Sequence, residues 1–361
     1  MKIVLAQHPE CDFLGHAIST GLYENSHEIL EIPYVKSLHG QVDDWYLLAD
    51  GKRGMSAPPG YLQINPLPDN ERSEEEVLDI VGEADLIISH STRRYALAAL
   101  DKIINRLGRN PGNIVIADGD DTDYIDRGII ERFRPIVFFK REMLQHYPLA
   151  AYSVSYGCPI FPLPFASFTR GFPEVDDQDK NMDFFLSLGN TNPLRNKLLG
   201  KCLEARIDKI YIATDGNNPI RGQHPFGHEI QQMLPWPEYI KAQSQAKIGA
   251  SCAGFGRDTL NFWEKMSFET LCLWCDPGIV IPYPPIPNQH VVEFTEDCED
   301  VPRLIKYYLD PIHEGERKAI AKAGKSWLYA HHTTQQRATW LLDISRKIMG
   351  GEKVEPEEFG L

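Results

Sequence analysis

The sequence predicts an α/β protein of two domains, each built around a doubly wound parallel sheet. The chain has 361 residues, which exceeds the size of one ordinary hydrophobic core and suits two. Short apolar runs alternate with helix-like runs in both halves, and a proline-rich and then acidic segment at 159–181 separates the halves. Two such Rossmann-like domains are expected to face each other across a cleft, with the ligand at the carboxyl ends of the strands.

The first half begins with "KIVLA" (2–6), a continuous apolar run that indicates a strand buried on both faces. A helix is expected at 73–84, because Ser73 and Glu76 stand at the two positions of a capping box. Gly108 is placed to end another helix. The other elements expected here are strands at 28–35, 85–91, 113–121 and 134–142 and helices at 13–24 and 94–108.

The same alternation resumes after the proline-rich segment. The expected strands lie at 182–190, 209–214, 247–253 and 271–276, and the expected helices at 194–205, 239–246, 259–270, 300–309, 314–329 and 334–349. We therefore expect an N-terminal domain at 1–165, a linker at 166–181, a C-terminal domain at 182–340, and a C-terminal helix and tail at 341–361. The last helix is a candidate to cross back to the first domain.

Composition narrows the possible ligands and the location. The formal net charge is −14, which disfavours a protein that grips a phosphate backbone with a basic face, whereas a small anionic ligand needs one or two local cations. No apolar run approaches the roughly 20 residues that span a bilayer, and the N-terminus has the pattern of a strand and not of a signal peptide. The seven cysteines are an odd number, and several sit in apolar runs, so we expect reduced thiols and a cytoplasmic protein.

A glycine-containing loop in the last third carries the most chemistry. In "AGFGRDTLNFWE" (253–264), Gly254 and Gly256 follow an expected strand, where glycines let backbone N–H groups approach a ligand. Asp258 is the expected N-cap of the next helix, and Arg257 adds a full positive charge. The loop therefore predicts a phosphate site.

The helix after this loop offers a partner for the rest of such a ligand. Arg257, Asn261 and Glu264 are spaced i, i+4, i+7 and are expected to share one helical face. Glu264 stands in an apolar helix, where a carboxylate could accept two hydrogen bonds from vicinal ribose hydroxyls. A second loop, "LSLGNTNPLRNKLL" (186–199), places Arg195 and Lys197 at a helix start, either as diphosphate contacts or as solvated residues.

Two other interpretations of the glycine loop stay open. One is a dinucleotide fingerprint, G-x-G-x-x-G, with Thr259 in place of the third glycine and Asp276 as the acid about 20 residues on. That interpretation predicts an NAD-dependent oxidoreductase. The other is a turn without a ligand, followed by a solvated Glu264.

The glycine loop and the helix after it resemble those of the GT-B glycosyltransferases. "GFGRDTLNFWEKMSFETLCLW" is similar to their nucleotide-sugar loop and helix, a C-terminal domain of the glycosyl transferase group 1 type. The CgeB-like and exostosin-like groups are nearest. "HPECDFLGHAISTGL", "DGDDTDYI", "VFFKRE" and "PLPFA" resemble parts of their N-terminal domain, and 304–343 resembles their C-terminal helices. The sequence departs from the pattern at Asn261, where an arginine is common, and at Glu269, within "SFET" in place of a glycine-containing motif.

The resemblance implies a nucleotide-diphosphate-sugar donor of UDP or GDP type, bound mainly by the C-terminal domain, with no cofactor and no metal. It implies that Glu264 holds the ribose, and that Gly254, Gly256, Arg257, Arg195, Lys197 and Asn261 belong to the donor site. The N-terminal domain would then bind the acceptor.

Catalytic candidates follow strands of the N-terminal domain. His8 and Glu10 follow the first strand, and Asp118 stands at the end of "NIVIAD". Sugar transfer needs a base for inversion, or assistance by the donor phosphate for retention, and both stay open. His8 could be a base, an oxyanion donor or a loop histidine.

The sequence thus predicts a cytoplasmic glycosyltransferase. The acceptor hydroxyl could belong to a saccharide, a protein, a metabolite or a modified DNA base, and the oligomeric state is left open. The rivals are the NAD-dependent oxidoreductase and a catalytically degenerate binding protein.

Overall fold

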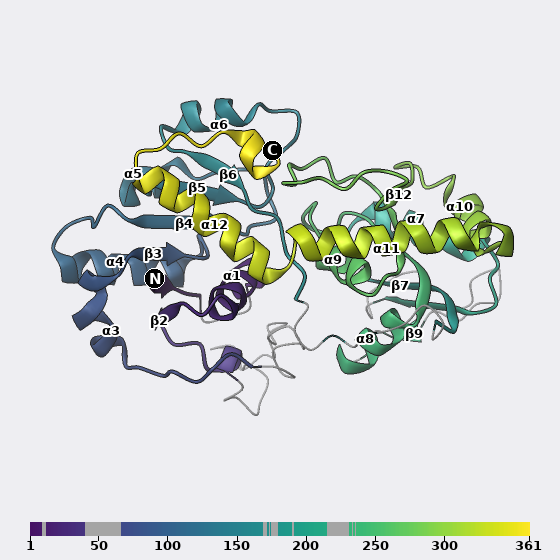
Figure 1. Cartoon of the computed structure of the whole chain (residues 1–361), viewed down its shortest axis with the longest axis horizontal. Coiled ribbons are helices and arrows are strands. Elements are labelled where there is room, and N and C mark those ends of the chain that lie inside the picture. The colour runs from purple at the N-terminus through teal and green to yellow at the C-terminus, as the bar shows by residue number, and fades with distance from the viewer. Residues whose placement is uncertain are drawn as a thin grey trace. The chain divides into compact units, whose positions relative to one another are not determined.

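The structure is a computed structural model that describes residues 1–8, 12–39, 66–168, 172, 174, 180–189, 191–214, 231–232, 234 and 236–361. The chain forms two compact units (Figure 1). The first unit comprises Met1–Gly171, Ile279–Tyr283 and Thr333–Leu361, and the second comprises Phe172–Gly278 and Pro284–His332. Each unit has a parallel sheet with helices between its strands, so the predicted α/β class is confirmed.

The first unit holds a six-stranded parallel sheet in the order β2-β1-β3-β4-β5-β6. The chain therefore changes direction between β1 and β3, where ligands of such sheets bind. The strands are β1 (Lys2–Ala6), β2 (Glu28–Ile32), β3 (Leu86–Ser89), β4 (Ile114–Asp118), β5 (Val137–Lys140) and β6 (Ile160–Pro162). The helices are α1 (Phe13–Glu24), α3 (Glu74–Ile80), α4 (Arg94–Leu107), α5 (Arg127–Phe133), α6 (Leu149–Tyr156) and α12 (Thr334–Met349).

The C-terminal helix α12 belongs to the first unit and lies beside α1 (Figure 1). Gly21 of α1 permits this approach, because a Cβ there would lie 2.0 Å from the carbonyl oxygen of Thr334. The Thr334 hydroxyl donates to the Glu24 carboxylate over 2.7 Å, and the Asn25 amide donates to the Gln335 carbonyl over 3.2 Å. The last helix therefore completes the fold of the N-terminal half.

The second unit holds another six-stranded parallel sheet, in the order β12-β11-β10-β7-β8-β9. Counted along the unit this is the order 6-5-4-1-2-3 of dinucleotide-binding sheets, so the chain changes direction between β7 and β10. The strands are β7 (Met182–Leu188), β8 (Ile210–Thr214), β9 (Gln231–Gln232), β10 (Ala246–Ser251), β11 (Leu271–Trp274) and β12 (Val292–Glu293). The helices are α7 (Pro193–Glu204), α8 (Trp236–Ser244), α9 (Leu260–Ser267), α10 (Val301–Leu309) and α11 (Glu314–His331).

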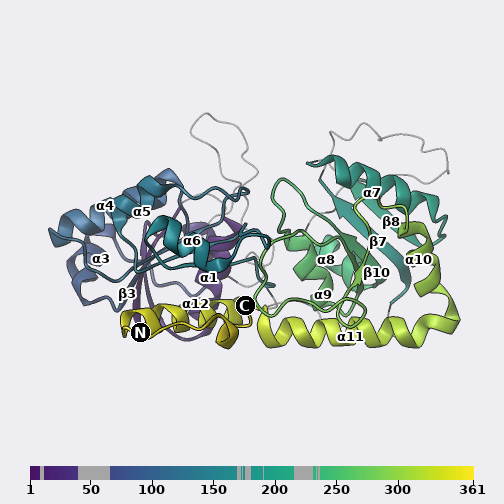
Figure 2. The same ribbon diagram turned by 90° about the horizontal axis from the view of Figure 1, so that it is seen from above.

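Helices cover both faces of this second sheet. Figure 2 shows α7 on one side of the strands and α8 and α9 on the other. One core cluster packs α7, α10 and α11 against the sheet, with Phe184 and Leu273 at its centre, and a smaller one packs Phe185 against Tyr239 and Phe268. Alternate residues of one strand therefore serve two cores, as a sheet buried on both faces requires.

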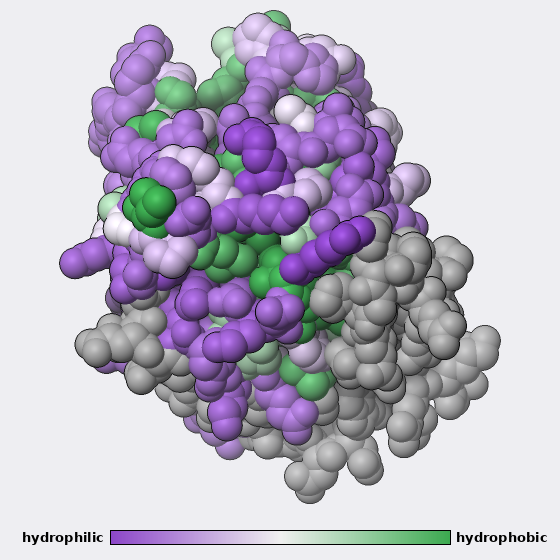
Figure 3. Space-filling view, turned by 90° about the vertical axis from the view of Figure 1, so that its right-hand side faces the viewer, coloured by the Kyte–Doolittle hydropathy of each residue, from purple (hydrophilic) through white to green (hydrophobic). Residues whose placement is uncertain are grey.

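Local signals read from the sequence are present at their residues. Ser73 and Glu76 form the predicted capping box, and Gly108 ends α4 in the left-handed conformation at φ 67°. Hydrophilic residues cover most of the face coloured by hydropathy in Figure 3, and hydrophobic residues show in small areas between them. Within the described part of the chain, no helix combines the length and apolarity needed to cross a membrane.

Candidate functional site

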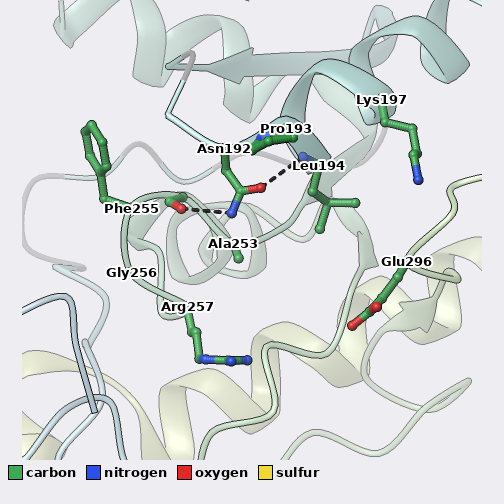
Figure 4. A pocket seen from close by; sticks show the side chains of 10 residues that line it. Asn192, Pro193, Leu194, Lys197, Ala253, Phe255, Gly256, Arg257 and Glu296 are labelled. Atoms are coloured by element: carbon green, nitrogen blue, oxygen red, sulfur yellow. Dashed lines mark hydrogen bonds between the residues drawn. The ribbon is translucent and has the colours of Figure 1, made fainter. Parts of the chain in front are cut away.

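A cavity opens in the second unit at the carboxyl ends of β7 and β10, the two strands between which the chain changes direction. Its volume is about 460 Å³, within the range of small-molecule sites. The start of α7 with the residue before it, the glycine loop before α9, and the loop after β12 form it (Figure 4). The lining residues are Asn192, Pro193, Leu194, Lys197, Ala253, Gly254, Phe255, Gly256, Arg257 and Glu296.

Asn192 and Arg195 tie these two loops together. The Asn192 Oδ1 caps α7 by accepting from the N–H of Leu194 over 2.9 Å, and its Nδ2 donates to the carbonyl of Gly254 over 3.1 Å. Arg195 donates from Nε to the carbonyl of Ala253 over 3.1 Å and from Nη1 to that of Gly189 over 3.2 Å. These contacts hold the backbone of both loops through the protein's own side chains.

Gly254 leaves room for the close approach of Arg195. A Cβ at this position would lie 2.4 Å from Nη2 of Arg195, closer than non-bonded atoms approach. The N–H of Gly254 donates to the carbonyl of Gly256 over 2.8 Å, so this amide is used inside the turn. The glycine loop therefore brings the Arg195 guanidinium against its backbone, a contact that the sequence did not indicate.

Three charged side chains line the cavity. Arg257 donates from Nη1 to the carbonyl of Pro277 over 2.9 Å, which anchors it to the turn after β11. Lys197 lies on α7, and Glu296 lies in the loop after β12. Neither of these two forms a hydrogen bond or ion pair through its side chain with any residue that the structure describes. Arg195, predicted as a donor contact, is not among the lining residues.

The helix after the glycine loop differs from its prediction at its first turn. Thr259, and not Asp258, occupies the N-cap of α9. The carboxylate of Asp258 instead accepts from the indole N–H of Trp263 over 2.9 Å. Arg257 precedes the helix, so the helical i, i+4, i+7 spacing does not apply to it, and only Asn261 and Glu264 share the helix.

Asn261 and Glu264 are buried outside the cavity lining. Asn261 accepts from the Ser251 hydroxyl over 2.6 Å and donates to the carbonyl of Ser187 over 3.3 Å, which links β10 to β7. Glu264 is 7% exposed, which excludes the solvated alternative, and its Oε2 accepts from the Tyr239 hydroxyl over 2.7 Å. Burial raises the pKa of Glu264, against the opposing influence of Tyr239 and Lys265.

The first unit places two of its three catalytic candidates at the carboxyl edge of its sheet. His8 follows β1 and is 5% exposed, with its ring edge-on to Tyr95 at 5.3 Å between centroids. Asp118 ends β4, where its Oδ2 accepts from Nζ of Lys140 over 2.7 Å and its Oδ1 accepts from the Thr92 hydroxyl over 3.0 Å. Glu10 lies outside the described residues.

Sequence reasoning missed two buried histidines near His8, which are His16 and His90. His90 follows β3, and its Nε2 lies 2.9 Å from Oε1 of Gln7. Asp12 caps α1 by accepting from the N–H of Gly15 over 3.0 Å. Burial is the largest influence on the pKa of Asp12 and raises it, but His90 and the hydrogen bonds outweigh burial and lower the pKa. Burial lowers the pKa of His16 to about 3, so this side chain is neutral. Polar residues directly after the apolar run "LIIS" were the available signal.

Comparison with known proteins identifies the fold. No family model and no curated protein matches the sequence. A glycosyltransferase from Rickettsia africae is 11% identical, with a TM-score of 0.62 over 96% of this chain and 98% of that one. Anabaena HepE in complex with UDP-glucose is 10% identical, with a TM-score of 0.59 over 96% of this chain and 100% of that one. The chain has the GT-B fold.

A third similar structure is sucrose-phosphate synthase from Thermosynechococcus elongatus, which is 12% identical with a TM-score of 0.55 over 98% of this chain and 100% of that one. At such identities the likeness concerns the fold and not the residues of a site. It extends over both GT-B units, because nearly the whole of each chain is covered.

Proposed function

We propose that this protein is a glycosyltransferase that moves a sugar from a nucleotide-diphosphate-sugar donor to a hydroxyl acceptor. The observation that carries the proposal is the cavity at the carboxyl ends of β7 and β10, where Lys197 and Arg257 supply positive charge at the change of direction of the second sheet. The GT-B fold adds support, since HepE, a protein of this fold, has been crystallised with UDP-glucose. The CgeB-like or exostosin-like subgroup stays a prediction.

The donor diphosphate is proposed to lie against the glycine loop. Lys197 and Arg257 would balance its charge without a metal ion, and Gly254 and Gly256 would allow it to approach the backbone. Arg195 would act from behind the loop by holding Ala253 and Gly189 in place. Among the described residues, no group of three or more His, Cys, Asp or Glu is arranged to hold a metal ion.

Asn261 and Glu264 stay proposed donor residues with different roles. Asn261 would hold the carboxyl ends of β7 and β10, from which two loops of the site begin. Oε1 of Glu264 has no hydrogen-bond partner among the described residues, so it could accept from a ribose hydroxyl. Because Glu264 lies outside the cavity lining, such a ribose would have to extend beyond the cavity towards α9.

The chemical step is proposed to use the first unit. His8 and Glu10 are the candidates for proton transfer with the acceptor, which could be a saccharide, a protein, a metabolite or a modified base. Both oxygens of Asp118 accept hydrogen bonds, so its proposed part is to hold Lys140 and Thr92 in place. The six described cysteines are free and buried, which supports a reducing, cytoplasmic setting.

Calorimetric titration with UDP, GDP and NAD tests the proposal. We expect UDP or GDP to bind and NAD to bind at least tenfold more weakly. We also expect Arg257→Met to reduce the affinity for the nucleoside diphosphate. A panel of nucleotide-sugars then identifies the donor by its slow hydrolysis. Tight NAD binding without UDP or GDP binding would favour the oxidoreductase and overturn the proposal.

A further inference from the structure

Among the described residues that line the donor cavity, one carries a carboxylate, and it is Glu296. Glu296 lies in the loop after β12, about 40 residues along the chain from the glycine loop. Figure 4 shows Glu296 and Lys197 on one side of the cavity and Phe255 on the other. A carboxylate in a site for a diphosphate repels the ligand unless it faces a part of the ligand that donates hydrogen bonds.

The polar groups of the cavity differ in whether the protein itself holds them. Asn192 and Arg257 donate to the carbonyls of Gly254 and Pro277, which fixes their positions. Lys197 and Glu296 form no side-chain hydrogen bond or ion pair with the described residues, and they are not paired with each other. The ammonium therefore stays available to an anionic group of a ligand, and the carboxylate to a group that donates hydrogen bonds.

We propose that Glu296 recognises the neutral nucleoside part of the donor by accepting from its N–H or O–H groups. The inference rests on the proposed function, and it assigns a specificity role to a residue that the glycine-loop pattern does not include. The diphosphate then lies towards Lys197, Arg257 and the glycine loop, because Glu296 repels it. Glu296 contributes selectivity between nucleoside diphosphates and simple anions.

The two ligand parts give Glu296→Ala opposite expected effects. Loss of the acceptor should reduce the affinity for UDP or GDP roughly tenfold, since a hydrogen bond to a charged group is lost. Loss of the negative charge should strengthen inorganic pyrophosphate about two- to threefold, because repulsion is removed. The matched control is Glu293→Ala, an exposed glutamate at the end of β12 that makes the same change in net charge outside the cavity lining.

Calorimetry and competition at low ionic strength measure both ligands for the wild type and the variants. An equal loss of UDP and GDP affinity points to the ribose hydroxyls, and a larger loss for GDP points to the N–H edge of the base; both support the proposal. Changes of the same sign for pyrophosphate and nucleoside diphosphates overturn it. If Glu264→Gln, and not Glu296→Ala, weakens the binding of nucleoside diphosphates and strengthens that of pyrophosphate, the proposal is also overturned. The recognising carboxylate is then Glu264. If the wild type binds neither UDP nor GDP, the proposed function itself fails.

Discussion

The carboxyl edges of the two sheets use charge in different ways. In the first unit, Lys140 and Asp118 at this edge are buried and paired with each other. In the second unit, Lys197 and Glu296 line a cavity without an internal partner among the described residues. Removal of one partner of a buried charge pair destabilises the fold, whereas charges without internal partners are available to a ligand.

The difference follows from how completely each edge satisfies its own polar groups. Asp118 accepts from Lys140, from Thr92 and from the N–H of Asp120. The second edge uses Asn192 and Arg195 to fix its backbone and leaves other side chains facing the cavity. Substitutions should therefore affect folding in the first unit and ligand affinity in the second, and four substitutions test this contrast.

The largest effect is expected for Lys140→Met. The ammonium group is fully buried, and its removal leaves the Asp118 carboxylate buried with less compensation. We expect the first unit to lose about 3–5 kcal/mol of unfolding free energy. Hydrogen exchange of β4 and β5 amides in increasing urea measures this loss for the first unit alone.

Two further variants define the cause of that loss. Arg132→Met breaks the exposed pair with Asp101 on the same unit and should cost less than about 1 kcal/mol. The double variant Lys140→Met with Asp118→Asn should recover part of the stability, because the unpaired charge is gone. A loss below about 1 kcal/mol for Lys140→Met would contradict the contrast between the units.

The next effect concerns His39, which is buried between two acceptors. Its Nδ1 lies 2.6 Å from the carbonyl of Pro68 and its Nε2 lies 3.0 Å from Oε1 of Glu31, so both nitrogens must carry a proton to donate. Tyr23 also donates to Glu31, and Tyr34 stacks on the imidazole. Burial is the largest influence on the pKa of His39 and lowers it, but the hydrogen bond and charge of Glu31 outweigh burial and raise it.

Because the folded pKa lies above the ordinary 6.5, protonated His39 stabilises the folded first unit. This contribution is complete below pH 6.5 and is lost as the pH rises through the raised folded pKa. We expect His39→Gln to remove roughly 1.5–3 kcal/mol at pH 6 and less at pH 9. Exchange of β2 amides across that pH range measures it, and an equal loss at both pH values would contradict a charged His39.

A smaller effect is expected for Asn192→Ala in the second unit. Loss of the α7 cap should cost about 1 kcal/mol, and loss of the bond to the Gly254 carbonyl should loosen the glycine loop and weaken UDP or GDP. Asn192→Ser separates the two roles, because serine caps a helix but lacks the amide that donates to Gly254. For Asn192→Ser, chemical unfolding should show retained stability and calorimetry should show reduced nucleotide affinity. Unchanged affinity in both variants would show that the hydrogen bond from Asn192 to Gly254 does not support the site.

Much of the fold could be predicted from local pattern. The apolar runs, the Ser73 capping box and the Gly108 helix end are all decided within a few residues, and the structure has each of them. The glycine loop after β10 was also found, because a strand, two glycines and an arginine are adjacent in the chain.

The parts that sequence reasoning missed depend on contacts between distant segments. Asp258 was expected to cap α9, but its carboxylate instead accepts a hydrogen bond from the indole N–H of Trp263, five residues further along the chain. The Asn261 amide donates a hydrogen bond to the carbonyl of Ser187, which lies 74 residues earlier in the chain and comes near because β7 pairs with β10. Glu296 reaches the cavity because β12 lies at the end of the same sheet, an order that no local signal contains.

The smallest effect on stability, and the sharpest contrast with Lys140, is expected for Lys197→Met. Lys197 makes no side-chain hydrogen bond or ion pair with the described residues, so the unfolding free energy should change by less than about 0.5 kcal/mol. The affinity for UDP or GDP should fall roughly tenfold, because a cation that faces the ligand is lost.

Lys201 provides the matched control, since it lies one turn further along α7 and pairs with Glu204 and Glu299 outside the cavity lining. Lys201→Met makes the same change in net charge, so any affinity it loses reports only the distant field, which added salt screens. If the two variants weaken the nucleotide equally, Lys197 acts through that field and not by contact. If only Lys197→Met loses tenfold in affinity, at unchanged stability, the Lys197 ammonium contacts the ligand. Lys140 differs, because its buried ammonium stabilises the fold and contacts no ligand.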